Sequence, residues 1–357
     1  MTSAPIRGGS AWGPGTLAAD LAEHTTLRVG GPARALVTAR TEAELVERVR
    51  ALDAAGEPVL ILGGGSNLLV GDDGFDGTVI KVATRGIQAD ESGCAGAVVE
   101  VAAGEDWDRL VAHAVSHEWS GIEALSGIPG LVGATPIQNV GAYGSEVAHT
   151  ISTVRTWDRR SRQQATFAAA DCGFGYRGSR FKIERDRFVI LSVTFQFRLG
   201  DRAAPVRYAE LARALGVELG ARPPAGQVRE AVLGLRRAKG MVLDAADPDT
   251  FSAGSFFTNP VLPAEEVWRL PAEAPRWPQP DGSVKTSAAW LIERAGFSRG
   301  YGAGPARLST KHTLALTNRG SARAEDLLVL AREIRAGVQA AYGITLVPEP
   351  VLVGCSL

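Results

Sequence analysis

The spacing of apolar residues alternates along the chain between the period of a helix and the period of a strand. From Thr41, the segment TEAELVERVRALDAAG places Leu45, Val49 and Leu52 on one face of a helix. Thr41 with a glutamate three residues later has the spacing of a capping box, and Gly56 follows the last periodic residue. We therefore expect a helix between Thr41 and Gly56.

Short apolar runs predict the strands that surround this helix and follow it. Strands are expected over 59–62, 78–82, 98–101 and 151–157, with a second helix over 106–118. The first helix and the strands at 59–62 and 78–82 form an α/β unit, which we take as the first domain. In 188–199, leucine, valine and phenylalanine alternate with polar residues from Leu191 to Arg198, which is the pattern of a half-buried strand.

The last part of the chain combines a junction, a further α+β region and a returning strand. Residues 200–226 are rich in Arg, Ala, Pro and Gly and are predicted to be a junction. Leu327, Leu330, Ile334 and Val338 share one face of a late amphipathic helix. A strand is predicted over 344–347, and because a short strand is not stable alone, we expect this end of the chain to pair with an earlier domain.

Composition and charge exclude several classes of protein. Of the 357 residues, 45% are hydrophobic, which is enough for a sizeable core. The chain has 38 Lys+Arg and 39 Asp+Glu, so it lacks the excess of positive charge that binds nucleic acid or an anionic membrane surface. No apolar run reaches the length of a bilayer span, and residues 1–15 lack the core of a secretory signal and are expected to be frayed. The chain has an odd number of cysteines, and they lie far apart in the sequence: Cys94, Cys172 and Cys355. This argues against a framework of disulfide bonds and favours a protein of the reducing cytoplasm.

Glycines directly after the predicted strand at 59–62 form the best candidate for a phosphate-binding loop. Glycine lets consecutive backbone N–H groups turn toward an anion without obstruction by a Cβ atom. The loop is not a P-loop, and Leu68 stands where a dinucleotide fingerprint needs its last glycine. An ordinary tight turn is the alternative. The candidate residues are Gly63, Gly64, Gly65, Ser66 and Asn67.

A second glycine-rich stretch covers residues 126–144 and has no clean periodicity. Its closely spaced glycine N–H donors, together with Gln138, Asn139 and Tyr143, could wrap a flat polar ligand. The alternative is an ordered loop that satisfies its own side chains.

Metal and hydrolase chemistry find little support in the sequence. His113 and His117 have the i, i+4 spacing of a zinc pair, but Ala114 stands where the general-base glutamate would be needed, so we expect no metal site. There is no GxSxG nucleophile elbow either.

Several polar residues stand alone among glycine, phenylalanine and proline. Such neighbours predict that the polar side chain is partly shielded from water. A shielded arginine binds an anion strongly, and a shielded glutamate can stay protonated. Each could equally form a structural hydrogen bond or ion pair. These residues are Tyr176, Arg177, Lys239, Ser255, Asn259 and Glu349.

At these residues the chain resembles the UDP-N-acetylenolpyruvoylglucosamine reductase family. The resemblance runs from Thr25 to Glu349 through TLRVGGPA, ILGGGSNLLV, LSGIPGLVGATPIQNVGAYG, CGFGYRGSRFK, AGSFFTNP, DGSVKTSAAWLI and VPEP, in the order of the family. It implies an α+β fold: an FAD-binding fold of the vanillyl-alcohol-oxidase (PCMH) type in two subdomains, 1–84 and 85–236, and a C-terminal α+β substrate-binding domain, 237–342. A strand within 343–357 would complete the first subdomain.

The resemblance also implies the ligands and the residues that hold them. Non-covalent FAD would be the cofactor and NADPH the co-substrate, and the glycine loop at 63–67 would hold the FAD pyrophosphate. The cofactor residues so implied are the five of that loop and Ser126, Gly127, Ile128, Pro129, Gly130, Gly133, Ala134, Gln138, Asn139, Gly141, Ala142 and Tyr143.

For the reaction, the resemblance implies that NADPH reduces FAD and leaves, after which flavin N5 delivers hydride to the β-carbon of UDP-N-acetylglucosamine enolpyruvate. Arg177 and Glu349 would stabilise negative charge on the substrate carboxylate, and Ser255 would protonate the α-carbon. The residues implied to bind or assist the substrate are Tyr176, Tyr208, Lys239, Asn259 and Lys285.

The end of the chain departs from the family pattern LEPEV, since Val347 replaces the first acidic residue and Pro350 follows Glu349. A flavin-dependent oxidase on the same fold and a non-catalytic nucleotide-sugar-binding protein are the alternative functions. We expect a monomer that binds neither nucleic acid nor membrane.

Overall fold

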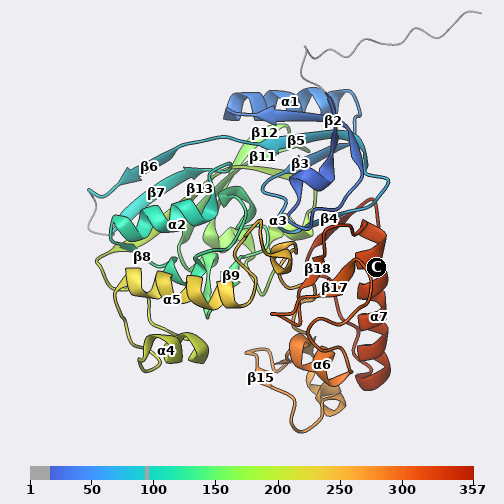
Figure 1. Cartoon of the computed structure of the whole chain (residues 1–357). Helices are drawn as coiled ribbons and strands as arrows, with labels where there is room; N and C mark the ends of the chain where they lie inside the picture. The colour runs from blue at the N-terminus through green and yellow to red at the C-terminus, as the bar shows by residue number, and fades with distance from the viewer. Residues whose placement is uncertain (1–16, 93–95) are drawn as a thin grey trace, which may run out of the picture.

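The computed structural model describes residues 17–92 and 96–357 (Figure 1). The expectations for residues 1–15 and for Cys94 therefore lie outside the described residues. The described chain forms three units, each built of strands and helices.

The first unit is built on a four-stranded sheet in the order β1-β2-β5-β3. Its strands are β1 (Leu17–Asp20), β2 (Pro32–Ala39), β3 (Val59–Leu62) and β5 (Phe75–Val82). Strands β2, β5 and β3 are parallel, and α1 (Glu42–Ala54) packs on them through Leu45, Val49 and Leu52. The Thr41 side chain accepts a hydrogen bond from the Glu44 N–H at 3.2 Å, so the predicted helix and its N-cap are confirmed.

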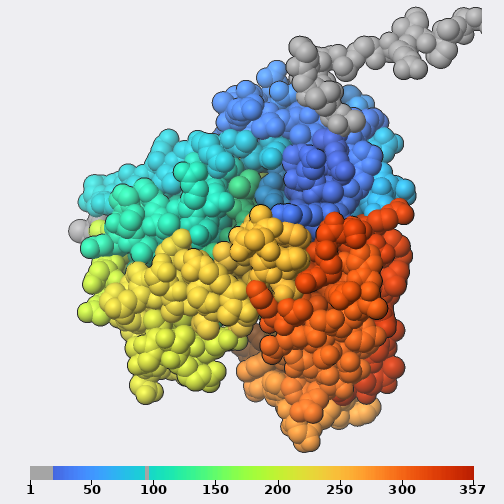
Figure 2. Space-filling model, viewed as in Figure 1, coloured from blue at the N-terminus to red at the C-terminus, as the bar shows by residue number. Residues whose placement is uncertain are grey.

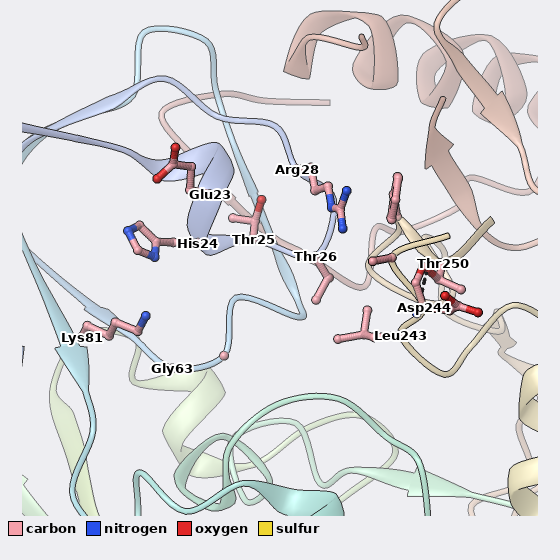
Figure 3. A pocket seen from close by; sticks show the side chains of 13 residues that line it. Glu23, His24, Thr25, Thr26, Arg28, Gly63, Lys81, Leu243, Asp244 and Thr250 are labelled. Carbon is pink, nitrogen blue, oxygen red and sulfur yellow. Dashed lines mark hydrogen bonds between the residues drawn. The ribbon is translucent and has the colours of Figure 1, made fainter. Parts of the chain in front are cut away.

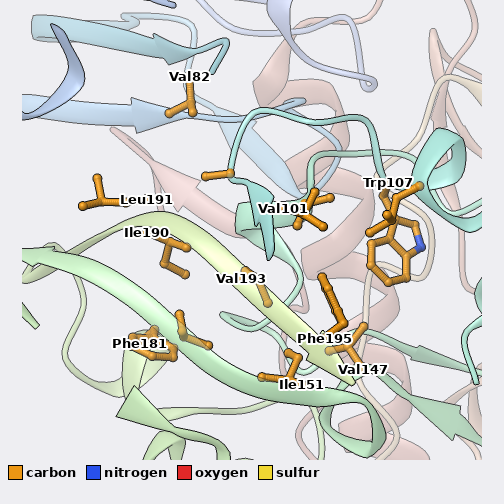
Figure 4. Close-up of a cluster of buried hydrophobic side chains, with 14 of the residues drawn as sticks. Val82, Val101, Trp107, Val147, Ile151, Phe181, Ile190, Leu191, Val193 and Phe195 are labelled. Carbon is orange, nitrogen blue, oxygen red and sulfur yellow. The ribbon is translucent and has the colours of Figure 1, made fainter. Parts of the chain in front are cut away.

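The second unit is a six-stranded antiparallel sheet in the order β12-β11-β13-β7-β6, with β8 also paired to β13. Its long central strand is β13 (Phe188–Leu199). The other strands are β6 (Ile87–Asp90), β7 (Ala97–Ala102), β8 (Trp119–Ser120), β11 (Ile151–Asp158) and β12 (Gln163–Ala168). Between them in the sequence lie a small hairpin, β9 (Gly141–Ala142) and β10 (Ser145–Glu146), and the helix α3 (Arg180–Ile183). Helix α2 (Trp107–Ser116) packs on this sheet through Trp107, whose ring centroid is 6.0 Å from that of Phe195 (Figure 4).

Strand β13 differs in one respect from the half-buried strand that its sequence predicts. The alternation holds from Thr194 onward, where Gln196 and Arg198 are exposed, whereas residues 189–193 are buried on both faces. The reason is that the first unit covers the second face there: Val82 joins the same hydrophobic cluster as Leu191 (Figure 4). The two sheets therefore share one core.

Helices α4 (Ala209–Leu215) and α5 (Ala225–Ala238) form a lobe beside the second sheet. Helix α4 lies inside the region that the sequence predicts to be a junction, so that prediction is wrong for 209–215. Its Leu211 and Ala212 are buried against Val228 and Val232 of α5, and this tertiary packing stabilises a helix too short to show a clear period.

The third unit packs helices on small sheets. It contains α6 (Ala288–Arg294), α7 (Ala324–Tyr342), the hairpin of β17 (Ala306–Leu308) and β18 (Leu316–Asn318), and the three-stranded sheet of β14 (Val261–Leu262), β16 (Val284–Lys285) and β15 (Trp277–Pro278). Helix α7 buries all four predicted residues, Leu327, Leu330, Ile334 and Val338. Figure 2 shows an indentation between this unit, in orange and red, and the α4–α5 lobe, in yellow and green.

The end of the chain returns to the first unit through a parallel pair of strands. Strand β19 (Val351–Val353) pairs with β4 (Leu68–Val70), directly after the 63–67 loop. The structure has no strand over 344–347, so this prediction is wrong. Pro348 and Pro350 have no N–H to donate to a ladder, so regular pairing begins at Val351.

We predict that Gly65→Ala destabilises the protein strongly. Gly65 has φ +62°, and a Cβ atom there would lie 1.9 Å from the His24 carbonyl oxygen, so backbone would have to move. We expect a loss of roughly 3 kcal/mol or more in the free energy of unfolding, measured by urea denaturation. The matched control is Gly56→Ala, with φ +68° and no atom within 4 Å of the added Cβ. It should cost about 1 kcal/mol for its left-handed backbone alone, and equal losses in the two variants would contradict the close approach.

Candidate active site

The 63–67 loop presents unused backbone donors at the edge of the first sheet. In the part of the chain that the structure describes, the N–H groups of residues 63–67 donate to no protein acceptor. The loop lies against the second glycine-rich loop: the Ser66 hydroxyl donates to the Pro129 carbonyl at 2.9 Å, and a Cβ on Gly64 would lie 2.9 Å from the Cα of Gly130. Clustered free N–H groups with no room for side chains form a cradle that fits a diphosphate.

A pocket of about 360 Å³ opens beside this loop (Figure 3). Gly63, Gly64, Arg28 and Lys81 line it from the first unit, and residues 243–245 and 250–251 line it from the other side. The Arg28 guanidinium carbon lies 3.6 Å from the centroid of the Phe251 ring. The pocket therefore brings two glycines of the loop together with the cations Arg28 and Lys81 and with the carboxylates Glu23 and Asp244.

Three side chains that the sequence assigns to the cofactor, those of Ser126, Gln138 and Asn139, form hydrogen bonds within the protein. The Asn139 amide nitrogen donates to Glu146 Oε2 at 2.8 Å and to the Gly175 carbonyl at 3.0 Å. The buried Ser126 hydroxyl donates to the Glu123 carbonyl at 2.7 Å. Gln138 reaches across to Glu349, as described below. Their role as cofactor residues stays a prediction, and for Ser126 and Asn139 it would rest on the backbone.

Arg177 stands at the tip of a tight turn. The N–H groups of Gly175 and Gly178 donate to each other's carbonyls at 3.0 and 3.2 Å, and Arg177 has φ 51°, a left-handed conformation that costs about 1 kcal/mol in a residue with a side chain. From this turn, Arg177 Nη2 donates to the Gly141 carbonyl at 2.7 Å, and Arg177 Nε lies 3.1 Å from Glu349 Oε1.

Glu349 is held on both its backbone and its side chain. Its N–H donates to the Phe256 carbonyl at 2.8 Å, next to the bridge between Phe257 and Pro348. Gln138 Nε2 donates to Glu349 Oε1 at 2.9 Å, on the same oxygen that faces Arg177. Because Ser255 directly precedes Phe256, the predicted general acid and Glu349 lie on neighbouring backbone segments.

Tyr176, Asn259 and Lys285 extend this network toward the third unit. The Asn259 N–H donates to the Tyr176 hydroxyl at 3.3 Å, and Lys285 Nζ lies 4.7 Å from the centroid of the Tyr176 ring. Burial raises the pKa of Tyr176, so its phenol stays protonated near neutral pH. The structure thus joins Tyr176, Asn259 and Lys285 to the Arg177–Glu349 pair.

Tyr208 and Lys239 belong to a second group, on the α4–α5 lobe. Lys239 Nζ pairs with Glu210 Oε2 at 2.6 Å and lies 5.7 Å from the centroid of the Tyr143 ring, which contacts the Tyr208 ring edge-on. Burial raises the pKa of Tyr143 to about 12. A lysine beside a protonated phenol can donate to an anion, provided that the anion displaces Glu210.

Sequence reasoning missed two titratable residues near these groups. Lys182 lies within the quoted CGFGYRGSRFK motif, and its Nζ donates to Gln138 Oε1 at 3.1 Å. His312 is an isolated histidine in the sequence, with no signal to single it out. Burial, together with the cations Lys239, Arg299 and Arg236, lowers the pKa of His312 to about 4.

The described residues hold no group of three His, Cys, Asp or Glu side chains that could bind a metal ion. The rings of His113 and His117 contact each other at a tilt, with centroids 4.0 Å apart; His113 meets the Trp119 ring edge-on and His117 meets it at a tilt. No helix among the described residues has both the length and the apolarity to cross a membrane.

Two family models match separate parts of the chain. Residues 33–164 match the family model described as FAD binding domain, which makes the chain an FAD-binding protein of the predicted α+β class. Residues 247–353 match the model described as UDP-N-acetylenolpyruvoylglucosamine reductase, C-terminal domain.

Relatives of known name cover nearly the whole chain. The UDP-N-acetylenolpyruvoylglucosamine reductase of Cutibacterium acnes is 61% identical over 340 residues, which are 94% of this chain and 90% of the relative. The protein of that name from Streptomyces coelicolor is 57% identical over 350 residues, 95% of this chain and 90% of the relative. The chain belongs to the UDP-N-acetylenolpyruvoylglucosamine reductase family. A crystal structure of such a reductase from Thermus caldophilus is 27% identical, with a TM-score of 0.66 over 95% of this chain and 98% of that one.

We predict that His312 makes the protein lose stability in mild acid. The unfolded chain protonates this histidine near its ordinary pKa of 6.5, and the folded protein does so near 4. Stability from the neutral imidazole is thus complete above pH 6.5 and falls as the pH drops toward 4, by about 2 kcal/mol at pH 5. His312→Gln should remove this part of the pH dependence in urea denaturation at pH 7.5 and pH 5.0. The control is His149→Gln at an exposed position; the same effect in both variants would rule out a special role for His312.

Proposed function

We propose that Arg177, Glu349 and Ser255 are the catalytic residues of this chain, and that Tyr176, Tyr208, Lys239, Asn259 and Lys285 bind its substrate. The reaction follows from the family. The chain is an FAD-dependent oxidoreductase that uses NADPH to convert UDP-N-acetylglucosamine enolpyruvate to UDP-N-acetylmuramate, a step of peptidoglycan precursor synthesis. The observation that carries the residue assignment is the contact of Arg177 with Glu349, at 3.1 Å.

Arg177 is suited to hold the carboxylate of the enolpyruvyl group. Its Nε faces Glu349 and its Nη2 faces the Gly141 carbonyl, whereas Nη1 donates to no acceptor among the described residues. The side chain is 22% exposed, so a carboxylate on Nη1 would meet a partly desolvated guanidinium that is already fixed in orientation. Negative charge that develops on the substrate during reduction would be stabilised there.

FAD, when bound and reduced, supplies the hydride for the β-carbon. We assign to Ser255 the proton for the α-carbon. The Ser255 hydroxyl makes no hydrogen bond within the described residues and is partly exposed, so it can face a bound ligand. A serine hydroxyl is a weak acid, and it can give up its proton to an enolate, which is a strong base. Lys239 and Asn259 are proposed to assist by stabilising the alkoxide.

We also propose that the enzyme acts as a monomer in the cytoplasm. Within one chain, Arg177 and Glu349 already contact each other and Tyr176 contacts Asn259, which supports a site formed by a single copy. The cytoplasm is where NADPH and nucleotide sugars are available, and burial raises the pKa of Cys172 to about 11, as suits an unreactive thiol in a reducing compartment. No specific observation favours an oxidase or a non-catalytic binding protein.

We predict that Ser255→Ala separates the two half-reactions. Flavin reduction by NADPH should stay within about twofold of the unaltered protein, because it does not use the serine proton. Reoxidation of the reduced flavin by the enolpyruvyl sugar should slow by 100-fold or more, on the order of 3 kcal/mol. Anaerobic stopped-flow absorbance measures both steps.

Ser116→Ala on α2 is the control, since that hydroxyl donates to the His113 carbonyl on the protein surface. Equal slowing of both half-reactions by Ser255→Ala would mean that Ser255 positions the site or supports folding and is not the acid.

A further inference from the structure

Gln138 and Lys182 form a chain of hydrogen bonds that ends on Glu349. Lys182 Nζ donates to Gln138 Oε1 at 3.1 Å and to the Arg177 carbonyl at 2.9 Å. Gln138 Nε2 donates in turn to Glu349 Oε1 at 2.9 Å. Lys182 therefore contacts both the residue that supports Glu349 and the backbone of the residue that pairs with it.

Lys182 fixes which way the Gln138 amide faces. An ammonium group has donors and no acceptor, so the amide oxygen must face Lys182 and the amide NH₂ group must face Glu349. The flipped amide would bring NH₂ against the ammonium and oxygen against the carboxylate, two repulsive contacts in a half-buried place. Loss of the Lys182 ammonium would remove this constraint.

This orientation determines which oxygen of Glu349 is free. Glu349 Oε1 accepts from Gln138 Nε2 and faces Arg177 Nε, so both donors act on the same atom. Glu349 Oε2 has no hydrogen-bond partner among the described residues. A proton carried by Glu349 would therefore reside on Oε2, where it could be donated to a ligand.

We infer that Gln138 and Lys182 are positioning residues, which hold Glu349 so that Oε2 faces the substrate. The inference rests on the proposed function of Glu349 and goes beyond it. It also gives Gln138 a role other than contact with the cofactor. Arg177 contacts Glu349 directly, and the charge of Glu349 also acts on Lys182 and on the Tyr176 phenol. Burial lowers the pKa of Lys182, and the negative charge of the nearby Glu349 carboxylate opposes this shift.

The test compares Lys182→Met and Gln138→Met with Lys182→Arg, which keeps a donor and a positive charge. Lys182→Met removes the ammonium group that orients the Gln138 amide, and Gln138→Met removes the donor to Glu349 Oε1, so the Glu349 side chain should lose its fixed orientation in both. Reoxidation of the reduced flavin by the enolpyruvyl sugar at pH 7.5 should slow by about 10- to 100-fold in both, and flavin reduction by NADPH should stay within twofold in Lys182→Met. Lys182→Arg should restore most of the rate.

A second measurement is independent of turnover. Titration calorimetry of the enolpyruvyl sugar into the oxidised holoenzyme, in two buffers of different ionisation enthalpy, gives the number of protons taken up on binding. This number should change in Lys182→Met and not in Lys182→Arg. The control variant is Arg185→Met, which removes an exposed cation from the same region and should behave as the unaltered protein does.

The outcomes separate this inference from the proposed function. If the unaltered protein does not reoxidise with the sugar, the proposed function fails, whatever the variants do. If it does, an unchanged rate of reoxidation and unchanged proton uptake in both Met variants would overturn the inference, as would equal slowing of both half-reactions in Lys182→Met. Should Lys182→Met or Gln138→Met fold poorly, judged by flavin content, Gln138→Glu replaces them. It keeps the volume and sets a second carboxylate against Glu349, so a rate of reoxidation unchanged from the unaltered protein would again contradict the inference.

Discussion

The contact between Arg177 and Glu349 is the constraint on which the rest of the site depends. The two side chains are 22% and 16% exposed, so neither can remain unpaired without a cost in free energy. Arg177 has a left-handed backbone conformation at this contact. Glu349 is held there by the hydrogen bond from its N–H to the Phe256 carbonyl. The parallel pair of β19 with β4 then anchors the end of the chain beside the glycine loop.

The same geometry connects the proposed cofactor site with the proposed chemistry. Asn67 ends the glycine loop, its carbonyl accepts from the Val351 N–H, and its side-chain nitrogen lies 3.4 Å from the Glu349 carbonyl. The glycine loop thus pairs with Val351, two residues after Glu349. This local backbone pairing would hold Glu349 beside a cofactor bound at the loop.

Sequence periodicity predicts elements whose burial is local and simple. Helices α1 and α7 follow from it, because each buries one face along its length, and so does strand β13 from Thr194 onward. Helix α4 and the true place of the last strand could not be predicted, because the first depends on packing against α5 and the second on the missing N–H groups of Pro348 and Pro350. The motifs named Arg177, Ser255 and Glu349, but the bond between Gln138 and Glu349 joins residues 211 positions apart. Neither spacing nor composition carries information on such a contact, so the part played by Gln138 and Lys182 needed the structure.

The central claim is that this arrangement passes electrons from NADPH through bound flavin to an enolpyruvyl sugar. Anaerobic flavin absorbance of the purified holoenzyme tests it most directly, with NADPH added first and UDP-N-acetylglucosamine enolpyruvate second. The account predicts that NADPH bleaches the flavin and that only the sugar restores its absorbance. Bleaching without recovery, or a protein that stays colourless when FAD is supplied, would contradict it.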